Sequence, residues 1–320
     1  MAEETKAEKI RRGVRELQVD MNCSMHCEMC EKFFICKNPE KLKIFERRRM
    51  SRVVTVMKRI DRKVAVCAGK GGVGKSMCTV QFSTVLASRG NRVAVLDQDL
   101  DGPCIPKMLG LTDKKLVMSD SGIIPVEGIF GMKIVSLGFI TTDKEIVNWF
   151  QEKRRNATEE FLSHVDYGEL DYLFIDLPPG TSSDAMNIME YIPDLDGMII
   201  VTNSTTISQG VAKRATIMAL ESGVNLLGIV ENMSGIVCPY CGNVEYPMQV
   251  GGGERLANEL DVPFLGRIPL DPINSECDDK GVPFVVENPD SLASKAVTEI
   301  TDKIIANIEE HERMVIAGER

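Results

Sequence analysis

The stretch Gly69-Lys70-Gly71-Gly72-Val73-Gly74-Lys75-Ser76 decides the fold, because it matches the phosphate-binding pattern G-x-x-x-x-G-K-[ST] at every fixed position. The apolar run 64–68 precedes it and predicts a buried strand, while residues 78–88 carry apolar side chains at helical spacing. Glycines let backbone N–H groups turn inward as an anion nest, and the helix N-terminus adds partial positive charge. We therefore expect bound ATP, with Lys75 at the terminal phosphates and the Ser76 hydroxyl as a Mg²⁺ ligand.

The other lysine of the loop, Lys70, is not required by the pattern. A cation at this position lies at the mouth of the loop, where it can meet phosphates bound by a facing subunit. Here the sequence resembles the deviant Walker A ATPases, which include the nitrogenase iron protein, the septum-site and partition ATPases and the Mrp/Nbp35 iron–sulfur carriers. The resemblance implies a nucleotide-sandwich homodimer in which Lys70 acts across the interface.

Composition limits the class of protein. The chain has 320 residues, of which 43% are hydrophobic, enough for one large α/β domain and an appendage. No apolar run approaches the ~20 residues of a membrane-spanning helix, and residues 1–15 are charged where a signal peptide would be apolar. We therefore expect a cytoplasmic protein with no membrane partner, in which the ten cysteines stay reduced.

The net charge of −9 is unevenly distributed along the chain. Residues 1–63 contain 17 Lys and Arg against 10 Asp and Glu, whereas the remainder is strongly acidic. A basic arm on an acidic body can indicate nucleic-acid binding. Because this arm has few aromatic residues and mixes charges of both signs, we favour a solvated helical linker and expect no nucleic-acid partner.

Beyond the extension, apolar strands alternate with helices. Strands are expected at residues 64–68, 92–97, 133–138, 171–176, 197–202, 225–231 and 264–268, and a final amphipathic helix at about 291–310. This alternation predicts an α/β domain over residues 64–320: the doubly wound, mostly parallel sheet of a P-loop NTPase, with ligand at the carboxyl ends of the strands. Residues 1–63 are expected to form a cysteine-rich N-terminal extension and helical linker.

Four cysteines of the extension lie close together at the spacing C-x3-C-x2-C-x5-C: Cys23, Cys27, Cys30 and Cys36. Thiolates this close in a reducing compartment favour a metal site. Compact runs favour a [4Fe–4S] cluster over zinc, whose sites usually combine two separated C-x2-C pairs. Spacing alone leaves zinc, and a run without metal, open. The first three also match the radical S-adenosylmethionine motif, but Met29 replaces its usual aromatic residue and Cys36 would fill the iron site that substrate needs.

Two further segments carry the residues that phosphoryl transfer requires. The pattern D-x-D-x-x-G-P-x-x-P, which begins at Asp97, resembles switch I of the Mrp/Nbp35 family, in which Asp99 is the residue expected at the attacking water. Family members commonly have Ser at the position of Cys104, so the role of this thiol stays open. Asp176 ends an apolar strand and suits a Walker B carboxylate that holds Mg²⁺ through its water shell.

The segment Pro178-Pro179-Gly180-Thr181 resembles switch II, in which Gly180 can turn its N–H toward the γ-phosphate. We therefore expect an ATPase whose catalytic residues are Asp99, Lys70 and Lys75. Within Glu231-Asn232-Met233-Ser234-Gly235, Asn232 resembles the base-reading asparagine of the family, with Pro269 beside the adenine ring.

The C-P-x-C-G knuckle at Cys238 and Cys241 supplies two metal ligands, so two copies facing across a dimer axis would complete a four-cysteine site. The alternatives are a knuckle without metal and a thioredoxin-like redox motif, although the latter would open a helix after the first strand. The phosphate loop, both switches, residues 231–235 and this cysteine pair follow the Mrp/Nbp35 order over residues 64–270. The resemblance implies that the pair binds a labile [4Fe–4S] cluster between protomers and that the dimer delivers it to apo iron–sulfur proteins.

Two other functions fit parts of the sequence. An ATP-gated electron-transfer protein like the nitrogenase iron protein would use two widely separated single cysteines per chain instead of a C-x2-C pair. A partition or membrane-positioning ATPase would need a DNA-binding or membrane-targeting element, and the acidic last helix suits an anionic bilayer poorly. The sequence leaves open the recipient proteins and the choice between a homodimer and a dimer with a paralogue.

Overall fold

The structure is a computed structural model that describes residues 36, 38, 40–120, 122–140, 151–180, 183–238, 240–247 and 249–318. Nine strands form its central sheet: β1 (Ile60–Ala68), β2 (Val93–Asp97), β5 (Val126–Glu127), β6 (Lys133–Ser136), β7 (Leu170–Asp176), β8 (Gly197–Thr202), β9 (Leu226–Val237), β10 (Val244–Glu245) and β11 (Phe264–Leu270). A separate hairpin consists of β3 (Val117–Ser119) and β4 (Gly122–Ile124).

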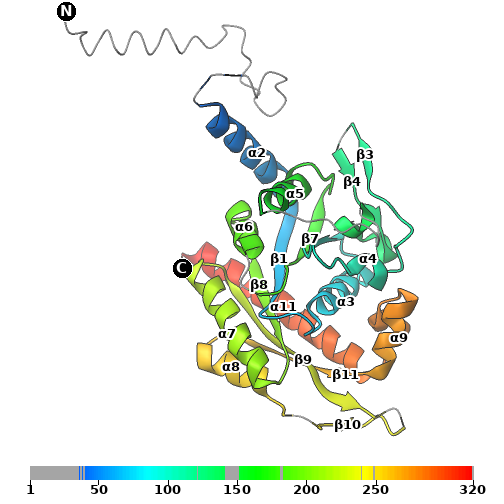
Figure 1. Cartoon of the computed structure of the whole chain (residues 1–320). Coiled ribbons are helices and arrows are strands. Elements are labelled where there is room, and N and C mark those ends of the chain that lie inside the picture. Colours follow the sequence, from blue (N-terminus) through cyan, green and yellow to red (C-terminus); the bar gives the residue numbers. More distant parts are fainter. Residues whose placement is uncertain are drawn as a thin grey trace, which may run out of the picture.

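The sheet has the order β10-β9-β8-β1-β7-β2-β6-β5, and β11 also pairs with β9 (Figure 1). Its inner pairs are parallel, whereas the two-residue strands β5 and β10 are antiparallel to their neighbours. The two strands beside β1 in the sheet, β7 and β8, come much later in the sequence, as in other doubly wound sheets. The predicted mostly parallel α/β fold is confirmed.

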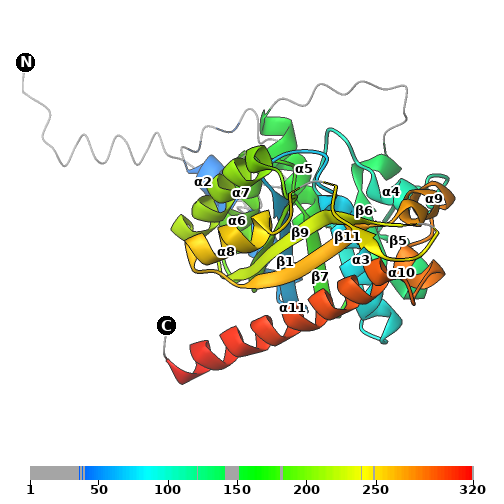
Figure 2. The same cartoon turned by 90° about the horizontal axis from the view of Figure 1, so that it is seen from below.

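Helices cover both faces of the sheet (Figures 1 and 2). One face packs against α2 (Lys41–Met57), α5 (Gln151–Ser163), α6 (Ser183–Tyr191), α7 (Thr206–Glu221) and α8 (Gly252–Leu260). The other face packs against α3 (Lys75–Ser88), α4 (Ile105–Met108), α10 (Phe284–Glu287) and α11 (Leu292–Ala317). Cys277 of α9 (Pro272–Lys280) joins this second core, and the 3-10 turns η2 (Ile129–Gly131) and η3 (Leu137–Phe139) flank β6 along the chain.

Strand β1 shows why the sequence forms this sheet. Its residues from Val64 to Ala68 are all fully buried, because helices exclude water from both faces. Side chains alternate between the faces, so Ala65 and Cys67 join one core and Val64 and Val66 join the other. A continuous apolar run with small residues is therefore the pattern that this central position requires.

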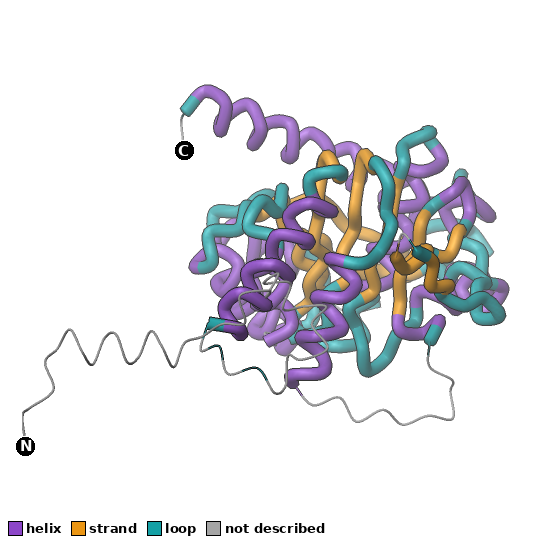
Figure 3. The backbone as a smooth tube through the Cα atoms, turned by 90° about the horizontal axis from the view of Figure 1, so that it is seen from above, coloured by secondary structure: helices purple, strands orange, loops and turns teal. Residues whose placement is uncertain are grey.

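The last helix, α11, begins at an N-cap where the Ser291 hydroxyl accepts from the backbone N–H of Ser294 at 3.1 Å. It buries Val297, Ile300, Ile304 and Ile308 on one stripe, each contributing roughly 1.5–3 kcal/mol. The helix runs past the edge of the sheet (Figures 2 and 3), and it ends at residue 317 instead of about 310 as expected. Among the residues described here, no helix has the length and apolar character needed to cross a membrane.

Two strands, β1 and β9, extend at least four residues further than the sequence predicted. β1 begins at Ile60, which pairs with Leu170 of β7 and is 2% exposed. The charged Asp61 and Arg62 interrupt the apolar run that the sequence prediction followed. β9 continues to Val237 because β10 and the end of β11 pair with its last residues. The boundary proposed at residue 63 stays a prediction, while α2 in the linker packs through Val53 and Met57 into the core shared with α5.

Candidate functional site

The carboxyl ends of β1, β2 and β7 bring the predicted nucleotide residues to one edge of the sheet. Asp97 on β2 is the Cα partner of Asp176 on β7, and Asp176 is in turn the partner of Val66 on β1. The phosphate-binding loop (residues 69–76) follows β1 directly. Parallel pairing therefore places the loop beside both carboxylates, as the strand pattern predicted.

Glycines give the phosphate-binding loop its shape. Gly72 and Gly74 have φ angles of 77° and 81°, which favour glycine over residues with a Cβ. A Cβ on Gly69 would lie 2.3 Å from the backbone carbon of Val211, so this residue lets the loop pack closely against α7. A Cβ on Gly72 would meet no atom within 4 Å, which leaves that side of the loop open.

Asp176 is the centre of the polar contacts behind the loop. Its carboxylate is fully buried and accepts from Lys75 Nζ at 2.6 Å, Ser76 Oγ at 2.6 Å and Thr79 Oγ1 at 2.7 Å. Burial lowers the pKa of Lys75, but attraction and hydrogen bonding to Asp176 outweigh it and the net pKa is raised. A hydroxyl and a carboxylate this close fit the oxygen ligands and outer shell of Mg²⁺, and the lysine stays charged for phosphate.

Two further aspartates lie close to Lys75 and Asp176: Asp97 at the end of β2 and Asp99 in the loop that follows. Burial, followed by the nearby Asp176 charge, raises the pKa of Asp97 to about 8. Its oxygens accept from Ser136 Oγ at 2.9 Å and from the Asp99 backbone N–H at 3.1 Å. Asp99 is less buried, and burial also raises its pKa, whereas Lys75 opposes this shift. Asp97 thus fixes the backbone of the loop that carries Asp99.

Two further residues, Cys104 and Gly180, contact the loop region from other segments. Cys104 is half-buried, and its pKa is raised by burial although a hydrogen bond with the Ser76 side chain opposes this shift. This thiol therefore contacts the predicted Mg²⁺ ligand. Gly180 has φ of 90° and donates its N–H to the Ala68 carbonyl at 2.8 Å, which joins the predicted switch II to the end of β1.

The remaining nucleotide residues lie around the loop in different settings. Lys70 is half-buried and has no ion-pair partner within the described part of the chain. Asn232 is 1% exposed and donates through Nδ2 to the Val73 carbonyl at 2.8 Å, which joins β9 to the loop. Pro269 is buried near the end of β11. Base recognition by Asn232 and Pro269 stays a prediction, since the Asn232 amide is here bonded to the loop itself.

The predicted cysteine pair lies on a tight turn between β9 and β10. The Cys238 N–H donates to the Asn243 carbonyl at 2.8 Å, and the Gly242 N–H donates to the Cys238 carbonyl at 2.9 Å. Hydrogen bonds to its sulfur from the backbone N–H groups of Tyr240 and Cys241, and from the Cys241 thiol, lower the pKa of Cys238. The turn therefore favours the thiolate, which is the form that binds metals.

A buried carboxylate holds the segment that follows this turn. Glu231 is fully buried and accepts from the backbone N–H groups of Gly253 at 2.6 Å and Gly251 at 3.0 Å, and from Ser234 Oγ at 2.6 Å. It thereby satisfies donors at the start of α8. Glu231 and Asn232 are consecutive, so the same strand contacts both the start of α8 and the phosphate-binding loop.

Most of the predicted N-terminal cluster lies outside the described residues: Cys23, Cys27 and Cys30. The fourth cysteine, Cys36, is half-buried, and its carbonyl accepts from Lys41 Nζ at 2.9 Å. Its role as a cluster ligand stays a prediction.

Sequence reasoning missed three contributors to the site. Thr79 follows Ser76 by three positions, so the helical period alone places both hydroxyls on one face of α3. Asp97 stood within the recognised aspartate pattern, but its raised pKa depends on burial beside Asp176. Arg154, on α5, donates hydrogen bonds to Asp101 and Asp184, and no local sequence pattern indicates these contacts.

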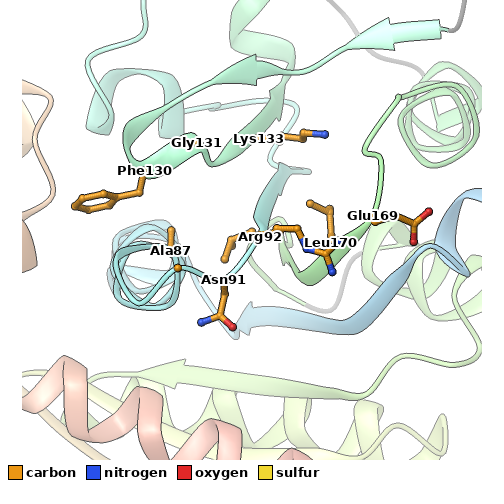
Figure 4. A pocket seen from close by; sticks show the side chains of 10 residues that line it. Ala87, Asn91, Arg92, Phe130, Gly131, Lys133, Glu169 and Leu170 are labelled. Carbon is orange, nitrogen blue, oxygen red and sulfur yellow. The ribbon is translucent and has the colours of Figure 1, made fainter.

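A cavity of about 250 Å³ lies at the opposite edge of the sheet, where β2 and β7 begin (Figure 4). Its cationic side chains already have partners: Arg92 pairs with Asp171 at 2.6 Å, and Lys133 Nζ donates to the Tyr167 carbonyl at 2.6 Å. The predicted nucleotide residues do not line it.

Comparisons with known proteins agree with this arrangement. A family model described as ParA, NUBPL iron-transfer P-loop NTPase, matches residues 59–305. An iron-sulfur cluster carrier protein of Methanocaldococcus jannaschii is 41% identical over 288 residues, which cover 90% of this chain and 98% of that protein. The cytosolic Fe-S cluster assembly factor NUBP2 of Bos taurus is 38% identical over 248 residues, covering 76% and 92%.

Solved structures share the fold. A nucleotide-binding protein from Archaeoglobus fulgidus in complex with ADP superposes with a TM-score of 0.64 at 34% identity, covering 72% of this chain and 91% of that one. The cell division ATPase MinD of Pyrococcus furiosus has a TM-score of 0.59 at 24% identity, covering 77% and 99%, which shows the fold alone.

Proposed function

The chain belongs to the NUBPL iron-transfer P-loop NTPases of the ParA group, and we propose that it is an ATP-dependent carrier of iron–sulfur clusters. A labile [4Fe–4S] cluster is its cargo, and Cys238 and Cys241 of two protomers hold it. The recipients are apo iron–sulfur proteins. The chain acts in the cytoplasm, the compartment named for the relative NUBP2.

The observation that carries this proposal is the cysteine turn. Cys241 is exposed, and the pKa of Cys238 is lowered by the turn's own amides and by the Cys241 thiol, so the pair is prepared to bind metal at the surface. A cluster held at an exposed turn is accessible to a recipient, whereas one in the core would not be. The pair supplies two ligands, and a second copy supplies the other two.

The nucleotide site controls loading or release of the cluster. ATP binds on the loop of residues 69–76, Ser76 and Asp176 hold Mg²⁺ and its water shell, and Gly180, Asn232 and Pro269 complete the pocket. Asp99 positions the attacking water and Lys75 compensates phosphate charge. The half-buried Lys70, without an ion pair among the described residues, is available for phosphate bound by a partner protomer. ATP hydrolysis is coupled to loading or release of the cluster at the cysteine turn.

The protein works as a homodimer or as a dimer with a paralogue. In residues 1–63, a second [4Fe–4S] cluster is bound by four cysteines: Cys23, Cys27, Cys30 and Cys36. This cluster is permanent, whereas the bridging cluster is exchangeable.

Anaerobic cluster reconstitution tests the function. The full chain is reconstituted with iron and sulfide, and its iron is divided into a chelator-labile fraction and a retained fraction. Cys238→Ala/Cys241→Ala is expected to lose the labile fraction, to keep the retained fraction and to bind ATP as the unchanged chain does. Delivery is measured as activation of an apo [4Fe–4S] enzyme, with and without Mg-ATP.

Tyr240→Ala is the matched control, because this side chain is 97% exposed within the same turn and its backbone N–H remains. It is expected to keep the labile fraction. If the double cysteine variant retains labile iron and still activates the apo-enzyme, the carrier site lies elsewhere and the proposal fails.

A further inference from the structure

Arg154 on α5 bonds two carboxylates at once. Its Nη1 donates to both carboxylate oxygens of Asp101 at 2.7 Å, while Nε and Nη2 donate to Asp184 Oδ2 at 2.9 Å and 2.6 Å. Three nitrogens of one planar guanidinium are therefore used, in the fork geometry that suits arginine and that lysine cannot reproduce.

The two carboxylates belong to the two segments expected to respond to the nucleotide. Asp101 lies two residues after Asp99, in the loop between β2 and α4. Asp184 lies in the first turn of α6, four residues after Gly180. These aspartates are far from Arg154 in sequence, by 53 and 30 positions, so the contact is a product of the tertiary fold.

The two ends of this contact differ in burial. The Asp184 side chain is 3% exposed, and within the described part of the chain its Oδ1 has no hydrogen-bond partner. Arg154 compensates this carboxylate, and losing the pair would be costly because the carboxylate is buried. The Asp101 side chain is 68% exposed, so water can replace Arg154 there. Arg154 is anchored to α6, and its releasable end is the loop that carries Asp99.

We propose that Arg154 is a positioning residue that couples the Asp99 loop to α6, so that movement beginning at Gly180 repositions Asp99 for ATP hydrolysis. This inference rests on the ATPase activity of the proposed function. It adds to it a physical connection between the two switch segments, made by a residue that is not among the predicted nucleotide-binding residues.

Two variants and a control test the connection. Arg154→Lys keeps the positive charge beside Asp184, which protects the fold, but a single ammonium cannot hold both carboxylates. Asp101→Ala removes the exposed end alone. Arg92→Lys is the matched control, because Arg92 makes a comparable exposed pair with Asp171 at the opposite edge of the sheet.

Hydrogen exchange and kinetics are both measured on the full chain. Arg154→Lys is expected to speed amide exchange in residues 98–104 and in the first turn of α6, and Asp101→Ala in residues 98–104 alone. In both variants kcat for ATP is expected to fall about three- to tenfold with little change in KM, and the double variant to be no worse than either single one. Exchange and kcat equal to those of Arg92→Lys, or independent effects that multiply, would overturn the coupling.

The test separates this inference from the carrier function. Labile iron bound through Cys238 and Cys241, together with Arg154 variants that behave like the control, would reject the coupling alone. Arg154-dependent turnover in a chain that holds no labile iron at these cysteines would support the coupling and reject the carrier. If the unchanged chain shows no turnover, the exchange data decide, and equal exchange in Arg154→Lys and Arg92→Lys overturns the proposal.

Discussion

Asp97 and Asp176 lie directly opposite each other at the ends of neighbouring parallel strands. Both are buried, and a single ammonium, that of Lys75, affects both. Asp176 accepts hydrogen bonds from three side chains, those of Lys75, Ser76 and Thr79. Asp97 accepts from one hydroxyl and one backbone N–H, so less offsets its burial. The pKa of Asp97 is therefore raised to about 8, first by burial and then by the Asp176 charge. Asp97 is therefore mostly protonated at neutral pH.

This asymmetry predicts how stability depends on pH. The unfolded pKa of an aspartate is about 3.9 and the folded one here is higher, so the contribution of Asp97 is complete below about pH 4 and is lost as pH rises through about 8. Asp97→Asn cannot ionise and avoids this loss. Between pH 5.5 and 8 the unfolding free energy of the unchanged chain is expected to fall relative to the variant, by up to about 1.4 kcal/mol per pH unit, and then to level off.

Denaturant unfolding at pH 5.5, 7, 8 and 9 measures this difference. Asp113→Asn, whose original side chain is 76% exposed, serves as the control and is expected to follow the unchanged chain at every pH. Parallel curves for Asp97→Asn and the unchanged chain would show that Asp97 ionises normally.

The hydroxyls beside Asp176 predict a graded loss of Mg²⁺ dependence. Ser76→Ala removes the proposed Mg²⁺ ligand, so added Mg²⁺ is expected to improve ATP affinity little in this variant. Thr79→Ala removes a hydroxyl that donates to Asp176 Oδ1 and to the Lys75 carbonyl, and it is expected to weaken the Mg²⁺ effect by about tenfold, as outer-shell changes do.

ATP titrations with Mg²⁺ and with a chelator measure this effect. Ser83→Ala is the control, because Ser83 Oγ lies one turn further along α3 and donates to the Thr79 carbonyl. A Ser76→Ala chain that gains as much from Mg²⁺ as the Ser83→Ala chain would remove Ser76 from the proposed metal site.

Replacing Glu231 is expected to destabilise the protein, because this carboxylate accepts from backbone N–H groups at the start of α8. In Glu231→Gln, an amide replaces a buried carboxylate that accepts from two backbone N–H groups and a hydroxyl, and the amide NH₂ cannot accept. The free energy of unfolding is expected to fall by about 1–3 kcal/mol. Denaturant unfolding measures it, with Glu254→Gln as the half-exposed control on α8. Equal stability of the two variants would show that the start of α8 needs no carboxylate.

The sequence predicted candidate site residues wherever the chemistry requires given residue types at fixed spacing, and their roles stay predictions. The loop around Lys75, the strand-end Asp176 and the pair at Cys238 are of this kind. Parallel strands were predictable because burial on both faces requires apolar runs. The raised pKa of Asp97 and the contacts of Arg154 were not predictable, since each depends on segments that meet only after folding. The start of β1 at Ile60 was missed because its second and third residues are charged and interrupt the apolar run.

The contact between Gly74 and Asn232 predicts how the phosphate-binding loop depends on β9. Gly74 has φ of 81°, and a Cβ added to it would lie 2.2 Å from Asn232 Nδ2. Gly74→Ala therefore strains the backbone and also displaces the amide that donates to the Val73 carbonyl. Gly72→Ala is a matched control, because its φ of 77° imposes similar strain while its Cβ would meet no atom within 4 Å. ATP affinity, measured by calorimetry, is expected to fall at least about tenfold further in Gly74→Ala than in Gly72→Ala, since clash is added to strain.

Labile iron, measured with and without ATP, is expected to lose its nucleotide dependence in Gly74→Ala alone, because the loop is then no longer joined to the strand that leads to Cys238. Equal losses in the two variants would mean that backbone strain accounts for the whole effect and that the hydrogen bond from Asn232 transmits nothing.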